Sequence, residues 1–171
     1  VFARPFDILR EAQEALRERN FMNFDPSKLS TINISESGRK IRLQKLETGE
    51  NDWQVLESNG ENEIQPYRAD PAIMDSLLKN LSTLRASGFT ADAPTASDNE
   101  NYGFNNPRRV VTLSFSVGDP LTLMLAHPEG REDVLYAKTN LADFIFKVER
   151  YTTLRMIPLD TPYYRNRLLD I

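Results

Sequence analysis

Apolar and polar residues alternate along residues 102–126, and this pattern predicts a β-hairpin around which the rest of the chain is organised. Hydroxyl residues separate the apolar positions of the first strand, so the two kinds of side chain should occupy opposite faces. Gly118, followed by Asp119, is typical of a two-residue turn, because glycine adopts positive φ without steric cost. The apolar residues expected on one face of each strand are Val111, Leu113, Phe115 and Val117, then Leu121, Leu123 and Leu125.

Three shorter strands are predicted before the hairpin, at residues 31–35, 41–46 and 52–56. In each, apolar residues recur at every second position, as in a strand with one buried face. Gly38 and Gly49 lie in the two loops between these strands, where the chain must reverse. The pattern therefore predicts a three-stranded antiparallel meander.

The clearest helical pattern begins after Asp70, which can cap the helix, with Pro71 in the first turn, where its missing N–H has no cost. Gly88 is expected to end it. A broad apolar stripe runs along this helix, and we expect the stripe to lie across a sheet. The stripe consists of Ile73, Met74, Leu77, Leu78, Leu81 and Leu84.

The remaining segments complete an α+β fold. The pattern predicts an amphipathic packing helix at residues 6–19 and a short helix at residues 149–157. Two further strands are predicted at residues 133–138 and 144–148, and residues 89–100 are expected to run along the surface. Strands separated by hairpin-length loops imply antiparallel pairing. We therefore expect an antiparallel sheet, built from the meander and a four-stranded segment, with one main amphipathic helix packed on it.

A short Arg-x-Arg piece stands near both ends of the chain, at Arg17/Arg19 and Arg165/Arg167, 148 positions apart (165 − 17 = 148). Two interpretations stay open: the piece marks the boundary of a repeated unit, or two unrelated helix ends share it by chance. On the first interpretation, residues 1–24 are a boundary segment, 25–160 a single domain, and 161–171 lead to a next unit. Because the chain begins at Val1, we expect it to be a piece of a longer protein.

Composition narrows the function classes. A chain of 171 residues suits one domain. Its net charge of −4 argues against a nucleic-acid binder, which needs a concentrated basic face. The absence of cysteine excludes disulfides and thiolate chemistry. No apolar run reaches the ~18 residues expected of a membrane span.

Candidate chemistry is sparse. His127 is the only histidine, with Glu129, Glu132 and Asp133 nearby, and acid–base or metal chemistry would need such partners within hydrogen-bonding distance. The preferred interpretation is a loop histidine without a chemical role. Arg108-Arg109 is interpreted as a solvated strand end. No phosphate-binding glycine loop, EF-hand spacing or nucleophile elbow occurs, so we expect no enzyme activity, cofactor or metal.

Several short motifs occur in an order that resembles a known bacterial family, the domain-of-unknown-function 4340 family. The most distinctive is Tyr-Gly-Phe-Asn-Asn-Pro at residues 102–107, in which Tyr102, Gly103 and Pro107, together with Gly118, are expected to shape turns. Ala126 departs from the pattern, because the family often has glycine there. The other matching pieces are residues 52–55, 67–70 and 110–115, Tyr136, and the two Arg-x-Arg pieces.

The resemblance implies a cellular context that composition does not. Members of the family are typically longer, are anchored by an N-terminal membrane helix, and are exposed outside the cytoplasm of bacteria. They often carry the unit in tandem, and resemble companions of ABC-type export or gliding-motility transport components. The resemblance supplies no catalytic residues.

Two main hypotheses follow, with an enzyme using carboxylates around His127 as a third. The leading hypothesis is a non-catalytic, extracytoplasmic interaction or scaffold domain, whose partners are membrane transport components or adjacent copies of the domain. The alternative is a ligand-binding module for an envelope glycan or small molecule, with a cleft beside the helix. The candidate inter-unit docking residues are Phe2, Phe6, Arg17, Arg19, Tyr163, Tyr164, Arg165 and Arg167.

Overall fold

The computed structural model describes residues 20–49, 52–59, 62–63, 66–159 and 164. Among these residues, ten strands form a single sheet in which every pair of neighbours is antiparallel. The strands are β1 (Leu29–Glu36), β2 (Arg39–Lys45), β3 (Trp53–Asn59), β4 (Asn62–Glu63), β5 (Tyr67–Arg68), β6 (Gly88–Asp92), β7 (Arg109–Phe115), β8 (Leu121–Ala126), β9 (Leu135–Thr139) and β10 (Phe144–Val148). The helices are the 3-10 turn η1 (Pro26–Lys28), α2 (Pro71–Ser82), α3 (Ala96–Asn101) and α4 (Arg150–Met156).

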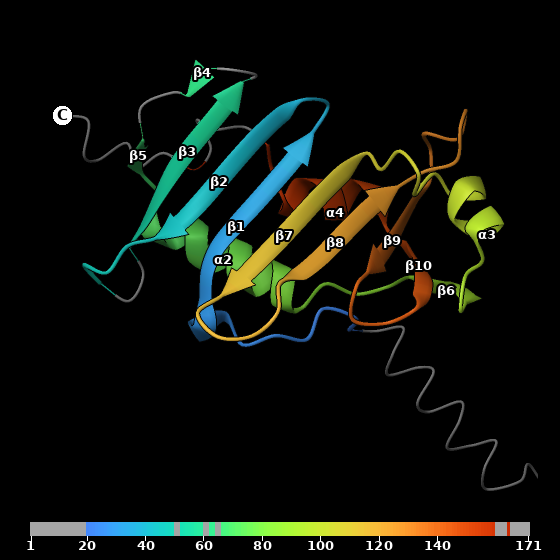
Figure 1. Ribbon diagram of the computed structural model, residues 1–171, viewed down its shortest axis with the longest axis horizontal. Helices are drawn as coiled ribbons and strands as arrows, with labels where there is room; N and C mark the ends of the chain where they lie inside the picture. Colours follow the sequence, from blue (N-terminus) through green and yellow to red (C-terminus); the bar gives the residue numbers. More distant parts are fainter. Residues whose placement is uncertain (1–19, 50–51, 60–61, 64–65, 160–163, 165–171) are drawn as a thin grey trace, which may run out of the picture.

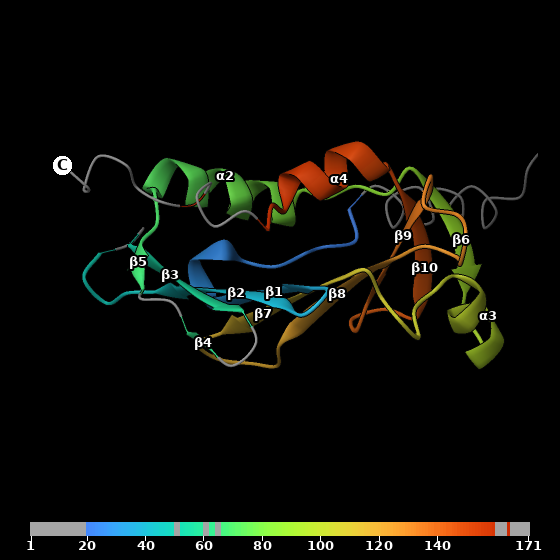
Figure 2. The same ribbon diagram turned by 90° about the horizontal axis from the view of Figure 1, so that it is seen from above.

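The strand order is β4-β3-β2-β1-β7-β8-β9-β10-β6, and β5 also pairs with β3 (Figure 1). The first meander, β1 to β3, thus meets the second, β7 to β10, where β1 pairs with β7. We call this β1–β7 pairing the central seam, in which Ile32 lies opposite Leu113. Seen from above, α2 and α4 both lie on one face of the sheet (Figure 2). The α+β class with an antiparallel sheet is therefore correct.

The helical layer and one sheet edge differ from the prediction. One main helix was expected on the sheet, but the short helix predicted at residues 149–157, which is α4, lies beside α2 on the same face, and α3 adds a third helix (Figure 2). The surface run expected at residues 89–100 contains most of strand β6, which pairs with β10, and most of α3. The run gives little local signal because β6 is short and begins with glycine, so its pairing with β10 determines its conformation.

The predicted hairpin exists, but its turn is longer than two residues. β7 ends at Phe115 and β8 begins at Leu121, so residues 116–120 form the loop. Pairing of β7 with β8 ends at Leu113 opposite Leu121, whereas on the other edge Phe115 still pairs with Leu29 of β1 and the amide of Ser116 donates to the carbonyl of Lys28. Val117, expected on the apolar face, is 85% exposed in the loop. Gly118 does adopt positive φ, at 106°.

The main core lies between the sheet and the two helices. Alternate residues of the central strands, such as Ile32, Ile41 and Leu113, are fully buried on this face. The side chain of Asp70 accepts from the amide of Ala72 and caps α2 as expected. Burying each leucine-sized side chain contributes about 2 kcal/mol. The core also includes Phe21, Met22 and Tyr164, which lie outside residues 25–160 of the predicted domain. The buried residues of α2 are Met74, Leu77, Leu78 and Leu81.

Candidate functional site

On the face of the sheet opposite α2 and α4, no described helix lies over β1, β2, β3 and β7, and α3 lies at the far end beside β8 and β9 (Figure 2). Because side chains alternate, the residues between the buried positions of β1, β2, β3, β7 and β8 point to this side. The register aligns them into rows across strands: Leu56, Arg42, Asn33, Thr112 and Thr122 form one such row. We call this surface the open face. Its side chains are Thr31, Asn33, Ser35, Lys40, Arg42, Gln44, Gln54, Leu56, Ser58, Val110, Thr112, Ser114, Thr122 and Met124, all exposed or half-buried.

The open face is basic although the chain carries a net charge of −4. Lys40 and Arg42 are exposed on it, and none of its described side chains is a carboxylate. The two carboxylates that the five strands do carry, Glu36 and Glu57, point to the helix side. There Glu36 pairs with Arg109, and Glu57 pairs with Arg39 at 3.4 Å.

A groove of about 390 Å³ runs over β1, β2 and β3 on the open face. Two exposed cations, hydrogen-bonding side chains and one aliphatic side chain line it, so it offers both charge and apolar contact. Its lining side chains on the open face are Asn33, Ser35, Lys40, Arg42, Leu56 and Ser58.

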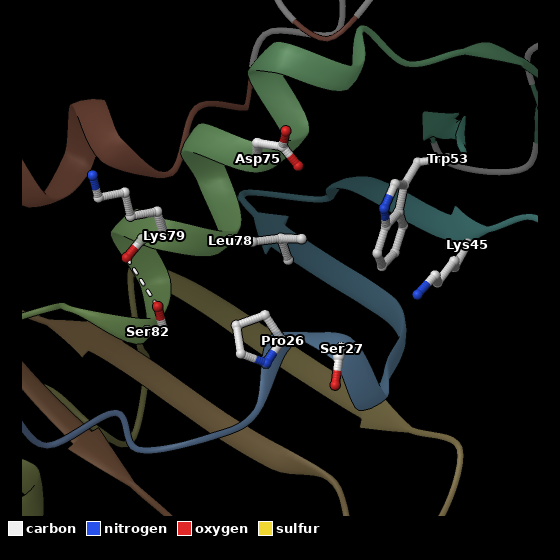
Figure 3. A pocket seen from close by; sticks show the side chains of 8 residues that line it. All are labelled: Pro26, Ser27, Lys45, Trp53, Asp75, Leu78, Lys79 and Ser82. Atoms are coloured by element: carbon white, nitrogen blue, oxygen red, sulfur yellow. Dashed lines mark hydrogen bonds between the residues drawn. The ribbon is translucent and has the colours of Figure 1, made fainter. Parts of the chain in front are cut away.

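A second hollow, of about 590 Å³, lies beside α2 on the other side of the sheet (Figure 3). Trp53 and Leu78 are buried at its base, while Asp75 on α2 and Lys45 on β2 reach into it from opposite walls. Its two serine hydroxyls already donate locally, Ser27 to Asp25 and Ser82 to the carbonyl of Lys79. The remaining lining residues are Pro26 and Lys79. We call this hollow the Trp53 cleft.

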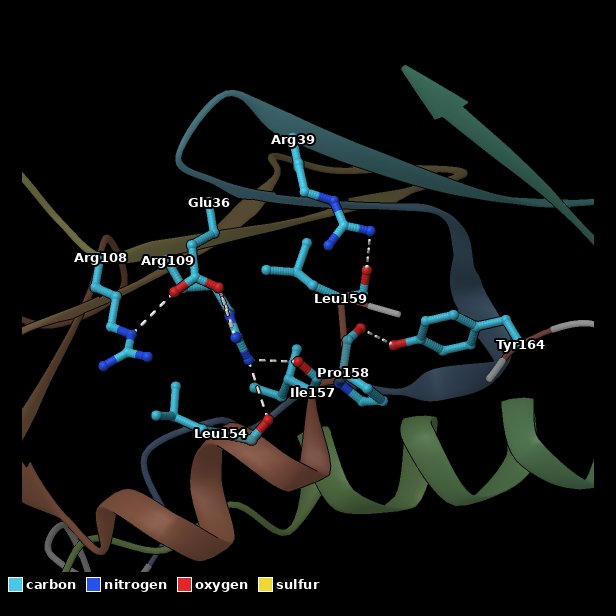
Figure 4. Close-up of polar contacts among 9 residues, drawn as sticks. All are labelled: Glu36, Arg39, Arg108, Arg109, Leu154, Ile157, Pro158, Leu159 and Tyr164. Atoms are coloured by element: carbon cyan, nitrogen blue, oxygen red, sulfur yellow. Dashed lines mark hydrogen bonds and ion pairs between the residues drawn. The ribbon is translucent and has the colours of Figure 1, made fainter. Parts of the chain in front are cut away.

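A buried polar cluster at the central seam joins the sheet to the end of α4 (Figure 4). Arg109, only 7% exposed, donates from Nη2 to Glu36 at 2.7 Å. Its Nη1 donates to the carbonyls of Leu154, at 3.1 Å, and Ile157, at 2.6 Å. The interpretation of Arg109 as a solvated strand end is therefore wrong. Arg109 shares the buried face of β7 with Val111 and Leu113, and Glu36 compensates its positive charge there.

The electrostatics of this cluster depend on Glu36. Partial burial alone would raise the pKa of Glu36, but hydrogen bonds and the positive charges of Arg109 and Arg108 outweigh it. The pKa of Glu36 therefore lies below its ordinary value of 4.5, and the group is ionised at neutral pH. Arg108 contributes a 2.9 Å contact from Nε. The cluster has the character of a structural clamp.

The turn motif at residues 102–107 packs α3 onto β8 and β9. The ring of Tyr102 meets that of Tyr136 edge-on, with centroids 4.7 Å apart. Gly103 has φ +87°, and a Cβ added there would lie 2.0 Å from the carbonyl oxygen of His127. Only glycine fits this position, because it combines positive φ with close backbone approach. Phe104 is buried beside Ala126, the position where the sequence departs from the family pattern.

His127 is half-buried, and its Nδ1 lies 3.0 Å from the carbonyl oxygen of Pro128. Within the described part of the chain, His127 forms no hydrogen bond or ion pair with a carboxylate. Of its sequence neighbours, Asp133 pairs with Arg131 at 2.8 Å, and this contact lowers the pKa of Asp133. The described residues also hold no group of three or more His, Asp or Glu side chains placed to bind a metal ion.

Of the eight predicted docking residues, the structure describes one, Tyr164. Tyr164 is fully buried; its hydroxyl donates to the carbonyl of Pro158, and its own carbonyl accepts from the amide of Asp70 at 2.8 Å (Figure 4). Its ring thus packs inside this domain, which corrects its assignment to an exposed inter-unit patch. The other predicted docking residues lie outside the described residues: Phe2, Phe6, Arg17, Arg19, Tyr163, Arg165 and Arg167.

The sequence interpretation did not single out Lys40 and Arg42 as site residues. Their signal was present: they alternate with Ile41 and Leu43, which are buried, so the strand pattern places both cations on the opposite face. What the pattern lacked was the knowledge that no described helix lies over β1, β2 and β3 on that face, and that α3 lies only at its far end, beside β8 and β9.

Comparison with known proteins identifies the family of the chain. The described residues include no helix with the length and apolarity needed to cross a bilayer. No curated protein and no solved structure matches the chain. A family model described as "Domain of unknown function (DUF4340)" matches residues 3–107 and, in a second overlapping match, residues 62–156. Since each match covers more than half of the 171 residues, the chain belongs to the DUF4340 family.

Proposed function

We propose that this chain is a non-catalytic interaction domain that docks a partner protein on the open face of its sheet. The observation that carries the proposal is the sorting of side chains: apolar residues face α2 and α4, while the other face presents rows of polar residues with two cations that form no ion pair with a described side chain. A sheet face with rows of Thr, Ser and Asn side chains can form hydrogen bonds, which suits contact with another protein.

The size of the open face indicates the class of complex. Strands lie about 4.8 Å apart and rise about 3.3 Å per residue, so five strands of about six residues cover roughly 24 Å by 20 Å. The area outlined by the backbone is therefore roughly 480 Å², whereas a standard stable interface buries about 800 Å² on each partner. The open face alone therefore suits a transient complex.

The proposed setting is the extracytoplasmic side of the bacterial envelope. There the domain would be one unit of a membrane-tethered accessory protein that assists an ABC-type transport or gliding-motility system. The family resemblance supports this setting, and the anchor would lie outside this chain. The partners would be transport components or adjacent copies of the domain.

Site-specific photo-crosslinking in the intact, membrane-bound parent protein tests the proposal. A photoreactive amino acid at Asn33, exposed on the open face, should give a discrete adduct with a partner protein identified by mass spectrometry. The matched control replaces Ser76, exposed on α2 on the opposite side. Equal adducts from both positions, or adducts from Ser76 alone, would contradict docking on the open face.

A second candidate function is small-ligand binding in the Trp53 cleft, which one specific observation favours. The cleft places an indole, an aliphatic side chain, a carboxylate and an ammonium around one hollow beside the helix (Figure 3). Convergent polar groups around an apolar base are typical of ligand sites.

Trp53 makes this candidate easy to test, because it is the only tryptophan in the chain. Intrinsic fluorescence therefore reports on the cleft without labelling. Envelope glycan fragments that bind there should shift the emission and raise the unfolding temperature, and Asp75→Ala should weaken both effects. Binding that is unchanged in Asp75→Ala would place the ligand elsewhere.

A further inference from the structure

We infer that the partner segment bound by the open-face groove is an extended acidic peptide stretch with carboxylates at alternate positions. This inference rests on the proposed docking function and names the chemistry of its partner. It starts from β2, where Lys40 and Arg42 are two residues apart and therefore on the same face. Their backbone positions are about 6.6 Å apart along the strand.

An extended peptide repeats its side chains with the same spacing, since residues i and i+2 of a strand also lie about 6.6 Å apart on one side. A segment lying along β2 can thus offer one carboxylate to Lys40 and the next to Arg42. Arg42 can bind a carboxylate through two parallel N–H donors, which fixes the orientation of the segment as well as its charge.

The surroundings of the two cations complement such a segment. Ser35 lies opposite Lys40 on β1, and Asn33 lies opposite Arg42, so each cation has a neutral hydrogen-bonding neighbour. On β3, Leu56 lies opposite Arg42 and supplies an apolar contact for the residue between two acids or beside them. The groove therefore recognises acidic residues interspersed with small or apolar ones.

Neither cation is already committed within the described part of the chain. Glu57 lies beside the groove, but its side chain points to the helix side, where its carboxylate pairs with Arg39. The Nη2 of Arg39 also donates to the carbonyl of Leu159. Glu36 is held on the other face by Arg109. No ion pair joins Lys40 or Arg42 to a side chain that the structure describes, so both cations are open to a carboxylate of a partner.

Charge also distinguishes an acidic peptide from a nucleic acid. Nucleic-acid binding is driven by neutralising several phosphates along the backbone, whereas the groove presents two cations on a chain of net charge −4. Two cations fit two carboxylates. A polyanion with denser charge would meet repulsion from the rest of the molecule.

Fluorescence anisotropy of a labelled peptide tests the inference with the purified chain. The probe has the sequence Glu-Leu-Glu-Ser-Glu with blocked ends, and its reference has glutamine in place of each glutamate. The acidic probe should bind at least about tenfold more tightly than the reference, and the difference should shrink as salt rises.

Two charge-reversed variants test whether Lys40 and Arg42 cause the preference for the acidic probe. Lys40→Glu/Arg42→Glu should lose the preference for the acidic probe. The control, Arg85→Glu/Lys147→Glu, changes the net charge equally at exposed cations outside the groove and should keep it. Circular dichroism checks that both variants are folded.

Three outcomes would overturn the inference: equal binding of the two peptides, equal loss in both variants, or tighter binding of single-stranded DNA than of the acidic probe. The docking function can fail separately. If a photoreactive group at Asn33 captures a partner while the acidic probe does not bind, the open face docks a protein of different chemistry. If both experiments are negative, the docking function itself is wrong.

Discussion

The Nη2 atom of Arg109 lies 2.7 Å from Oε2 of Glu36, on opposite sides of the central seam between β7 and β1. The same guanidinium donates to two carbonyls at the end of α4. One buried side chain therefore connects three elements that are distant in sequence. Since helix ends leave carbonyls without intrahelical partners, a cation there satisfies them as well as the carboxylate.

Replacing Arg109 should be strongly destabilising. Arg109→Met leaves Arg108 as the only described cation beside Glu36, and it removes the donor from the carbonyls of Leu154 and Ile157. The expected loss is about 3–5 kcal/mol of unfolding free energy. Arg108→Met is the matched control: the Arg108 side chain is 29% exposed and makes one contact, so its removal should cost under about 1 kcal/mol. Urea denaturation measures both, and similar losses would contradict the clamp.

The depressed pKa of Glu36 makes part of the stability depend on pH. Its folded-state pKa lies below the unfolded value, so its contribution is fully present above about 4.5 and is lost as pH falls through the folded pKa. In Glu36→Gln this contribution is absent at every pH. The difference in unfolding free energy between pH 7 and pH 3 should therefore be smaller in Glu36→Gln than in the unmodified protein. An unchanged difference would show that the arginines do not stabilise the ionised carboxylate.

Gly103 and Gly118 form a matched pair of glycines at positive φ. Gly103→Ala should cost more than about 2 kcal/mol, because strained backbone combines with a Cβ placed 2.0 Å from the His127 carbonyl oxygen. Gly118→Ala meets open space and should cost only the backbone strain, about 1–2 kcal/mol. Thermal unfolding compares them. A larger effect at Gly118 would be inconsistent with the tight packing of the turn at residues 102–107.

The apolar stripe of α2 should dominate the packing of the helix layer. Leu81 is fully buried, so Leu81→Ala should lose about 2–5 kcal/mol through lost burial and the cavity left behind. Ser76→Ala, at an exposed position of the same helix, should change stability by less than about 0.5 kcal/mol. Chemical denaturation followed by circular dichroism gives both values, and a small loss at Leu81 would mean that the sheet does not depend on α2.

Strong local patterns predicted individual elements well. The strand at residues 144–148 has the predicted bounds, and α2 begins with the predicted Asp70 cap and Pro71. Both follow from signals contained within a few residues. The prediction of a two-residue turn was wrong, because the pairing of β7 with β8 ends at Leu113 opposite Leu121 and leaves a longer loop, although the alternation of residues continues to Val117.

The candidate site was less predictable for the same reason. Alternation along β2 assigns Lys40 and Arg42 to one face, yet only the three-dimensional arrangement shows that α2 and α4 share the other. Arg109 alternates with Val111 and Leu113, and this register could have indicated burial. The partner that makes burial tolerable, Glu36, is 73 positions away in sequence.

The central seam also has a kinetic consequence. Each meander on its own consists of hairpins between consecutive strands, which need only short loops to close. The seam must instead bring Ile32 to Leu113, 81 positions apart (113 − 32 = 81), before any of its hydrogen bonds can form. Such non-local pairing slows folding, because the entropy of a long loop is lost before the contacts compensate for it. We therefore expect the pairing of β1 with β7 to be a late and slow event in the folding of this chain.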